Sequence, residues 1–157
     1  MPHEKDVVTS IMKDTRIAVL TYVDEQGRLV SMPMATQEFD DPGVVHFITE
    51  AVADKMSAIE ATPQVNVAYS SDDGWVSLSG TARRNDDRSL LEQLWGPANA
   101  AFMPGGPEDP NSTVLTVTAE TASYWESPGK AALVVEMAKG VVGDHKAKPG
   151  DSGTISL

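Results

Sequence analysis

The sequence predicts a mainly β domain with short helices, of the α+β class, in which about six antiparallel strands form a closed or split barrel. Stretches rich in β-branched residues, or alternating between apolar and polar residues, recur along the 157-residue chain. Most links between them are too short to hold the crossover helix that parallel strands need. Short helical patterns interrupt the strands. A barrel with these helices on its outside leaves the fewest strand edges exposed.

The first quarter of the chain predicts one helix and a hairpin. Residues 4–14 carry apolar side chains at helical spacing, and residues 16–23 are apolar on both faces, as in a buried strand. The turn at 24–27 leads into an extended pattern over 29–36, so these two strands pair. Pro33 has no N–H group, which predicts that the second strand lies at an edge of the sheet.

The next part of the chain predicts three strands and a short helix. The apolar run at 44–49 indicates the third strand, and the pattern over 54–61 indicates a helix that Pro63 ends. Residues 65–70 alternate between apolar and polar, and residues 75–83 do the same after a Gly-containing turn. Both are predicted to be half-buried strands.

A second short helix is predicted after the fifth strand. Its inner face is expected to hold Leu90, Leu91, Leu94 and Trp95. Asn85 or Asp86 is the expected N-cap, and Gly96 with Pro97 should end the helix. Residues 97–112 are rich in Pro and Gly and contain Phe102, which predicts a loop that covers another part of the molecule.

The last strand is predicted over 113–122, and Ser127 with Pro128 suits the N-cap and first position of a helix that Gly140 stops. Residues 141–157 are rich in Gly and Lys and predict a C-terminal arm or tail. The sequence thus indicates one split-barrel domain over residues 1–140, followed by that arm.

Composition excludes several classes of protein. The chain has 23 acidic and 12 basic residues, a net charge of −11, which disfavours nucleic-acid and anionic membrane partners. It has no cysteine, so a disulfide scaffold, a thiolate zinc site and a cysteine nucleophile are excluded. No secretory signal and no apolar run of roughly 20 residues is visible, so we expect a cytoplasmic protein. No metal-ligand cluster and no catalytic side chain can be assigned from the motifs.

Residues 49–55 form a candidate anion site. A strand ends in the hydroxyl of Thr49, a loop of small and acidic residues follows, and Lys55 falls at the start of a helix. A hydroxyl donor, a cation and helix N–H groups at one point suit a phosphate. The alternatives are that Lys55 is a solvated lysine and that Thr49 only caps the helix or ends the strand.

Seven stretches, in this order and spacing, resemble the pyridoxamine 5′-phosphate oxidase-like split-barrel flavoproteins, and within them the general stress protein branch. They are residues 31–36 (SMPMAT), 47–49 (FIT) with Lys55, 63–69 (PQVNVAY), 75–82 (WVSLSGTA), 94–97 (LWGP), 104–110 (PGGPEDP) and 124–125 (YW). The resemblance implies a six-stranded antiparallel split barrel that forms a homodimer, with FMN in the clefts between the subunits.

The resemblance also implies roles for individual residues. The strand with Ser31, Met32, Pro33 and Met34 would run beside the flavin ring, and its backbone would meet the polar edge of the ring. The motif with Ile48 and Thr49 would lie at the phosphate or ribityl chain, and Lys55 would pair with the phosphate. Trp75 would face the flavin from the partner subunit, and Trp95 and Trp125 could close the cleft. Without the resemblance, Met32 and Met34 would be core residues, and Trp75 and Trp95 would be packing residues.

Two departures from the family pattern bear on affinity. The family often has Arg where this chain has Met32, and oxidase members have Ser-Arg-Lys where this chain has Ala53, Asp54 and Lys55. A charge-assisted bond to phosphate contributes about 1.5–3 kcal/mol, so the loss of one or two would weaken FMN by roughly one to three powers of ten. The substrate-phosphate residues of the oxidase are not recognisable, and we do not expect oxidation of vitamin B6.

The resulting hypothesis is a flavin-dependent oxidoreductase with a general-stress role and an unknown small-molecule substrate, with NAD(P)H as a candidate reductant. Three alternatives remain: a flavin-binding protein without turnover, a dimeric split barrel that has lost flavin, and a related barrel that binds haem or a deazaflavin. The three histidines are isolated, and His46 is expected to be a hydrogen-bonded strand residue.

Overall fold

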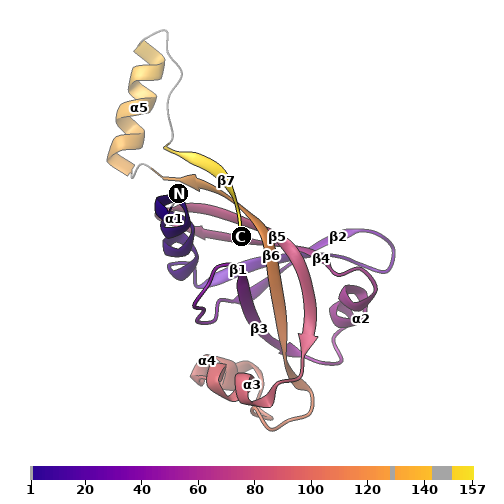
Figure 1. The fold of residues 1–157 in the computed structure, drawn as a ribbon. Coiled ribbons are helices and arrows are strands. Elements are labelled where there is room, and N and C mark those ends of the chain that lie inside the picture. The colour runs from indigo at the N-terminus through magenta and orange to yellow at the C-terminus, as the bar shows by residue number, and fades with distance from the viewer. Residues whose placement is uncertain (1, 128–129, 143–149) are drawn as a thin grey trace.

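The computed structural model describes residues 2–127, 130–142 and 150–157, and these residues form one antiparallel sheet with short helices around it (Figure 1). The sheet has seven strands in the order β2-β1-β4-β5-β6-β3, and β7 pairs with β6 beside this path. The strands are β1 (Ile17–Val23), β2 (Leu29–Ala35), β3 (Val44–Glu50), β4 (Gln64–Ser71), β5 (Gly74–Asn85), β6 (Ser112–Glu126) and β7 (Ser152–Ser156). The helices are α1 (Pro2–Lys13), α2 (Asp54–Ala61), α3 (Arg88–Leu94), α4 (Pro97–Phe102) and α5 (Lys130–Val142).

The sheet curls so that its two edge strands, β2 and β3, approach each other without pairing. This gap is the split of the barrel. All pairings between the strands are antiparallel. The predicted fold class is therefore confirmed, with β7 as an additional strand. Pro33 lies in edge strand β2, opposite Val19, as its missing N–H group predicts.

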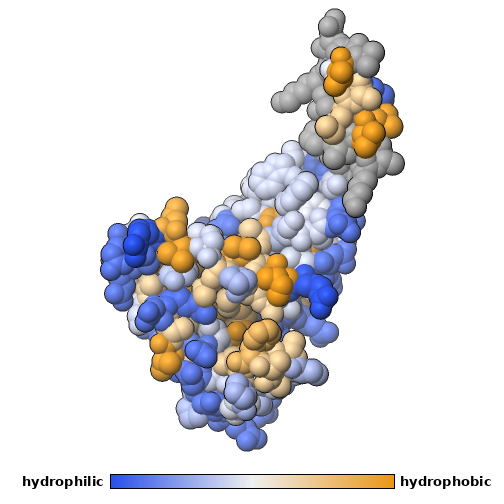
Figure 2. Space-filling model, turned by 180° about the vertical axis from the view of Figure 1, so that it is seen from behind, coloured by the Kyte–Doolittle hydropathy of each residue, from blue (hydrophilic) through white to orange (hydrophobic). Residues whose placement is uncertain are grey.

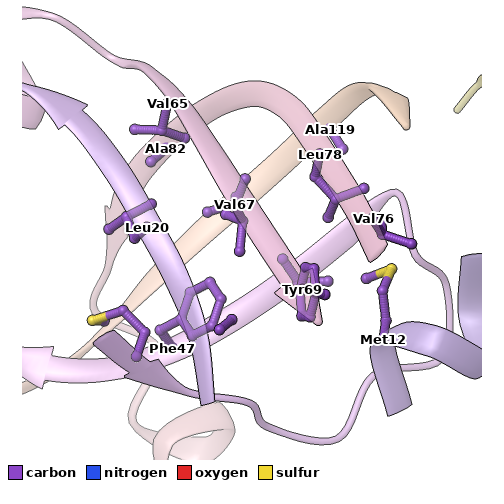
Figure 3. Packing of buried hydrophobic residues seen from close by; sticks show 14 of the residues in the cluster. Met12, Leu20, Phe47, Val65, Val67, Tyr69, Val76, Leu78, Ala82 and Ala119 are labelled. Carbon is purple, nitrogen blue, oxygen red and sulfur yellow. The ribbon is translucent and has the colours of Figure 1, made fainter. Parts of the chain in front are cut away.

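Alternating residues of the strands point into the barrel and form one core (Figure 3). Leu20, Phe47, Val67, Tyr69 and Leu78 are all nearly inaccessible to solvent. Each such side chain stabilises the fold by about 1.5–3 kcal/mol relative to an exposed one. Helix α1 packs on β4 and β5, and α2 packs on β1 and β5.

A bulge between Ser79 and Gly80 shifts the register of β5 against β6. Gly80 lies so close to β6 that a Cβ atom at this position would collide with the carbonyl oxygen of Thr118. A bulge of this kind bends and twists a strand, which lets the long strands β5 and β6 curve around the core. The glycine is therefore required by the close approach of the two backbones.

The structure corrects the predicted cap of α3. Its N-cap is Asp87, whose carboxylate accepts a hydrogen bond from the backbone N–H of Leu90 (3.2 Å), whereas Asn85 or Asp86 was expected. Asn85 is the last residue of β5, and the carboxylate of Asp86 is held by Arg84 at 2.7 Å. Both residues thus have other partners.

The predicted loop at 97–112 contains the short helix α4, with Pro97 at its start. Phe102 at its end is exposed, so the loop covers no other part of this chain through that residue.

The C-terminal region differs from a simple tail. Strand β6 continues to Glu126, and after α5 the chain returns as β7, which pairs with the last part of β6. Helix α5 continues two residues beyond Gly140. Pro128, the predicted first helical residue, and residues 143–149 of the predicted arm lie outside the described residues.

Candidate functional site

The loop between β3 and α2 holds the predicted anion site. Its backbone is fixed by Asn111: the N–H of Ala51 donates to the Asn111 carbonyl oxygen (2.7 Å), and the N–H of Val52 donates to the Asn111 side-chain oxygen (3.1 Å). The N-cap of α2 is Ala53, which supplies no side-chain acceptor to the first turn. Thr49 therefore does not cap the helix. Thr49 as a whole is buried, and within the described residues its hydroxyl has no hydrogen-bond partner.

Lys55 is 9% exposed, so it is a buried lysine and not a solvated one. Within the part of the chain that the structure describes, its ammonium group forms no hydrogen bond or ion pair. Burial lowers the pKa of Lys55, and the charge of Glu50 partly opposes that shift. A buried cation without a close partner is costly, and a bound anion would offset the cost.

The predicted ring-binding strand is β2, whose side chains divide between two faces. Met34 is buried in the core and Met32 is packed against it, while Ser31 and Pro33 face outward. The hydroxyl groups of Ser31 and Thr21 are hydrogen bonded at 2.8 Å. Because β2 is an edge strand, the backbone groups on its outer side do not pair with another strand and can meet a ligand. Of its side chains, only the outward ones can do so, because Met32 and Met34 point to the core.

Trp75 and Trp125 lie opposite each other on β5 and β6, and each is 50% exposed. The structure does not bring them to Thr49, which lies opposite Thr113 at the other end of β6. Twelve residues separate Thr113 from Trp125, roughly 40 Å along an extended strand. One copy of the chain therefore cannot place this Trp pair and the loop between β3 and α2 in a single small site. Ile48 is half-buried on β3, next to Thr49.

Trp95 is the C-cap of α3 and is half-buried. The start of α4, which follows it, borders a cavity of about 820 Å³. The other walls come from the end of β2, the start of β1 and the segment around Phe39. Thr36 in this wall has a buried hydroxyl oxygen without a partner among the described residues, and the Lys13 ammonium lies 5.6 Å from the centre of the Phe39 ring.

Sequence reasoning did not find this cavity. Its wall residues are far apart in the chain, and no motif joins them.

His46 is part-buried, and its Nδ1 lies 2.9 Å from the Thr116 hydroxyl, as expected for a hydrogen-bonded strand residue. Burial lowers the pKa of His46, and the charge of Arg83 adds to this effect. Among the described residues, no group of three or more His, Cys, Asp or Glu side chains could hold a metal ion. No helix in the described ranges is long and apolar enough to span a membrane.

The curled antiparallel sheet, whose edge strands β2 and β3 approach without pairing, defines the class of protein as a split barrel. The model of the pyridoxamine 5′-phosphate oxidase-like family matches residues 3–148. The chain therefore belongs to that family.

Solved structures agree with this assignment. A structure assigned as general stress protein 26 from Jannaschia sp. CCS1 matches 100% of both chains, with a TM-score of 0.80 and 27% identity. The general stress FMN/FAD binding protein of Xanthomonas citri is 28% identical, with a TM-score of 0.67 over 80% of this chain and 92% of that one. The protein bli-3 of Neurospora crassa is 28% identical over 148 residues, 86% of this chain and 71% of its own length.

Proposed function

We propose that this protein is a homodimeric FMN-binding protein, and that Thr49, Lys55 and the first turn of α2 hold the FMN phosphate. The observation that carries this proposal is the buried side chain of Lys55, whose ammonium group has no ion-pair partner among the described residues. The side chain is suited to a buried or half-buried anion. Family membership and the FMN/FAD-binding relative from Xanthomonas citri make a flavin phosphate the preferred anion.

The same geometry predicts a modest affinity for FMN. Lys55 is a single cation, whereas Glu50 and Asp54 are two carboxylates beside it in sequence. Met32 is uncharged and packs against the core. Many members of this family carry Arg at this position, so this chain lacks that cation. We therefore expect binding weaker by roughly one to three powers of ten than in a site with one or two further cations.

One surface of the sheet supports the homodimer. We call it the outer face and define it as the outward-pointing residues of β1, β2, β4, β5, β6 and β7 in three neighbouring rows. The rows are Ser31, Thr21, Asn66, Ser79, Thr121 and Ser156; Pro33, Val19, Ala68, Ser77, Ser123 and Thr154; and Ala35, Ile17, Ser70, Trp75, Trp125 and Ser152.

None of these residues is charged, although the chain carries a net charge of −11. Several of their polar groups are hydrogen bonded to one another within the face: Thr21 to Ser31 (2.8 Å), Asn66 to Ser77 (2.8 Å) and Ser123 to Thr154 (2.8 Å). Such a face can be buried without leaving many polar groups unpaired. A second copy on this face would also supply the Trp pair that one chain cannot bring to its own loop.

If the protein is catalytic, the bound flavin supplies the redox chemistry. The chain would contribute the phosphate contact of Lys55, the alignment of the ring by the β2 backbone, and the exclusion of water by the partner's aromatic residues. We propose a small oxidisable molecule or NAD(P)H as the reactant, and not vitamin B6.

The test is a titration of the purified protein with FMN, followed by flavin fluorescence and Trp emission. Saturable changes in both are expected. If neither signal changes up to high micromolar FMN, the proposal is wrong and the flavin-free interaction module is favoured. Bleaching of bound flavin by NADH or NADPH without oxygen would support an enzyme, and no bleaching would favour a flavin-binding protein without turnover.

A further inference from the structure

Helix α5 stands away from the body of the molecule (Figure 1). Among the described residues, the helices with extensive packing against the strands are α1, α2 and α3, and α5 is not one of them. Four of its large apolar side chains, Val134, Val135, Met137 and Val141, are 52–87% exposed. Figure 2 shows hydrophobic surface on this projecting part of the molecule. Val134, Met137 and Val141 recur at helical spacing and form one stripe. An exposed apolar stripe of this kind indicates a contact with another surface.

We call residues 128–149 the α5 arm. The strands on either side of this arm are fixed to each other. The backbone N–H of Glu126 donates to the Asp151 carbonyl oxygen (2.7 Å), and the N–H of Ser127 donates to the Asp73 carbonyl oxygen (2.8 Å). Glu126 and Asp151 are therefore held together, so the strands on either side of α5 are anchored next to each other. The apolar stripe is carried outward from the barrel, and not across its own core.

The charge of the arm is opposite to that of the body. Residues 128–149 contain four lysines and two acidic residues, a net charge of +2 with His145 neutral. The rest of the chain contains eight basic and 21 acidic residues, a net charge of −13. An apolar helix in a basic segment is complementary to an acidic protein surface. The strongly acidic body disfavours an anionic membrane as the alternative partner.

The arm is also continuous with the outer face of the sheet. Trp125 lies opposite both Trp75 and Ser152, so the root of the arm is the end of that face. In Figure 2 the body next to the arm is mostly pale, of intermediate hydropathy. A second copy seated on the outer face would lie beside the arm, and a helix of 13 residues is about 20 Å long, enough to extend along it.

We infer that α5 of each copy packs its apolar stripe against the acidic body of the other copy, so that the dimer is held by two exchanged arms as well as by the outer faces. This inference rests on the proposed homodimer. The contact is intermolecular, so the fraction of chains that form it rises with protein concentration. Its electrostatic part weakens at high salt.

A cross-linking experiment tests which copy the arm contacts. Because the chain has no cysteine, Val134→Cys gives a single attachment site for benzophenone maleimide. Illumination of a mixture of ¹⁴N- and ¹⁵N-labelled protein should give covalent dimers whose cross-linked peptides combine both isotopes. The matched control is Phe102→Cys, at an exposed apolar residue near the other end of the molecule. Cross-links within single copies only, or no more dimer than in the control, would overturn the inference.

An arm deletion separates this inference from the proposed function. Removing residues 128–149 leaves Ser127, Gly150 and Asp151 as a three-residue loop between β6 and β7, a length that hairpins use. We expect the dissociation constant of the dimer, measured by sedimentation equilibrium, to rise at least tenfold, with a circular dichroism spectrum that changes only by the loss of the α5 helical signal. The double variant Val134→Asp/Met137→Asp should have the same effect in the full-length chain. An unchanged dissociation constant in both would refute the arm contact and leave the homodimer standing, whereas a monomeric wild type would refute both.

Discussion

Lys55 is buried at the start of α2, and Glu50, the last residue of β3, is the acidic residue that acts on its charge. A bound anion would therefore stabilise the charged Lys55 relative to the unoccupied site. We predict that Lys55→Met weakens FMN binding by around tenfold and raises the melting temperature of the flavin-free protein by a few degrees, about 1 kcal/mol, because an incompletely paired buried charge is removed. Isothermal titration and thermal unfolding check the two effects. Lys5→Met, at an exposed lysine, is the control; if it matches Lys55→Met in both assays, the assignment fails.

The affinity for FMN should depend on pH through Lys55. Burial lowers its pKa, so in the free protein the ammonium group loses its proton at a lower pH than an ordinary lysine. The phosphate favours the charged form, and binding must then be accompanied by proton uptake. We expect the dissociation constant of FMN to rise as pH increases through this lowered pKa. Titrations across the alkaline range in wild type and Lys55→Met measure the effect, which should be smaller in the variant. Parallel curves would contradict the prediction.

The outer face should tolerate no charge at its centre. Ala68 is exposed between Val19 and Ser77. Ala68→Glu would bury a carboxylate in the proposed interface, so we expect a monomer in sedimentation experiments and FMN binding at least tenfold weaker. Ala100→Glu, on exposed helix α4, should leave both properties unchanged. A stable dimer of the Ala68→Glu variant would remove this face from the interface.

Gly80 should be indispensable for stability. Because any side chain would collide with the backbone at Thr118, Gly80→Ala must move β5 away from β6. We expect a loss of at least about 3 kcal/mol in the free energy of unfolding, measured with urea. Gly96→Ala is the matched change at a glycine whose added Cβ would meet no atom, and it should cost less than about 1 kcal/mol. Equal losses at the two positions would disprove the close-approach argument.

The N-cap of α3 gives a smaller effect. Asp87→Ala removes the acceptor for the Leu90 N–H group and should destabilise the protein by about 1 kcal/mol. Glu92→Ala, at an exposed residue of the same helix, should change stability by less than about 0.5 kcal/mol. Urea unfolding of both variants measures the difference. If Asp87→Ala cost no more than Glu92→Ala, the cap would be misassigned.

Local patterns predicted most of the fold. The helix at 54–61 has the predicted bounds, and the alternation of Val65, Val67 and Tyr69 correctly identified the inward face of β4. Strand β7 could not be predicted, because Ser152–Ser156 is short and mostly polar and gains its structure by pairing with β6. Asp87 was missed because a cap depends on where the preceding strand ends, which pairing decides.

The site shows the same division. The sequence placed Thr49 and Lys55 at a strand end and a helix start, and the structure has them there. The burial of Lys55 depends on packing between distant segments and could not be read from its neighbours. The cavity beside Thr36 is formed by segments that no sequence spacing connects.

Pro33 in edge strand β2 has a consequence for aggregation. An exposed edge strand offers its backbone to other chains, and such edges are starting points for aggregation. Proline presents no donor at this position, so another strand cannot add to β2 in a continuous ladder. Association between copies is thereby directed away from this edge, which could extend without limit, and towards the faces of the sheet, where the proposed dimer would be a finite pair.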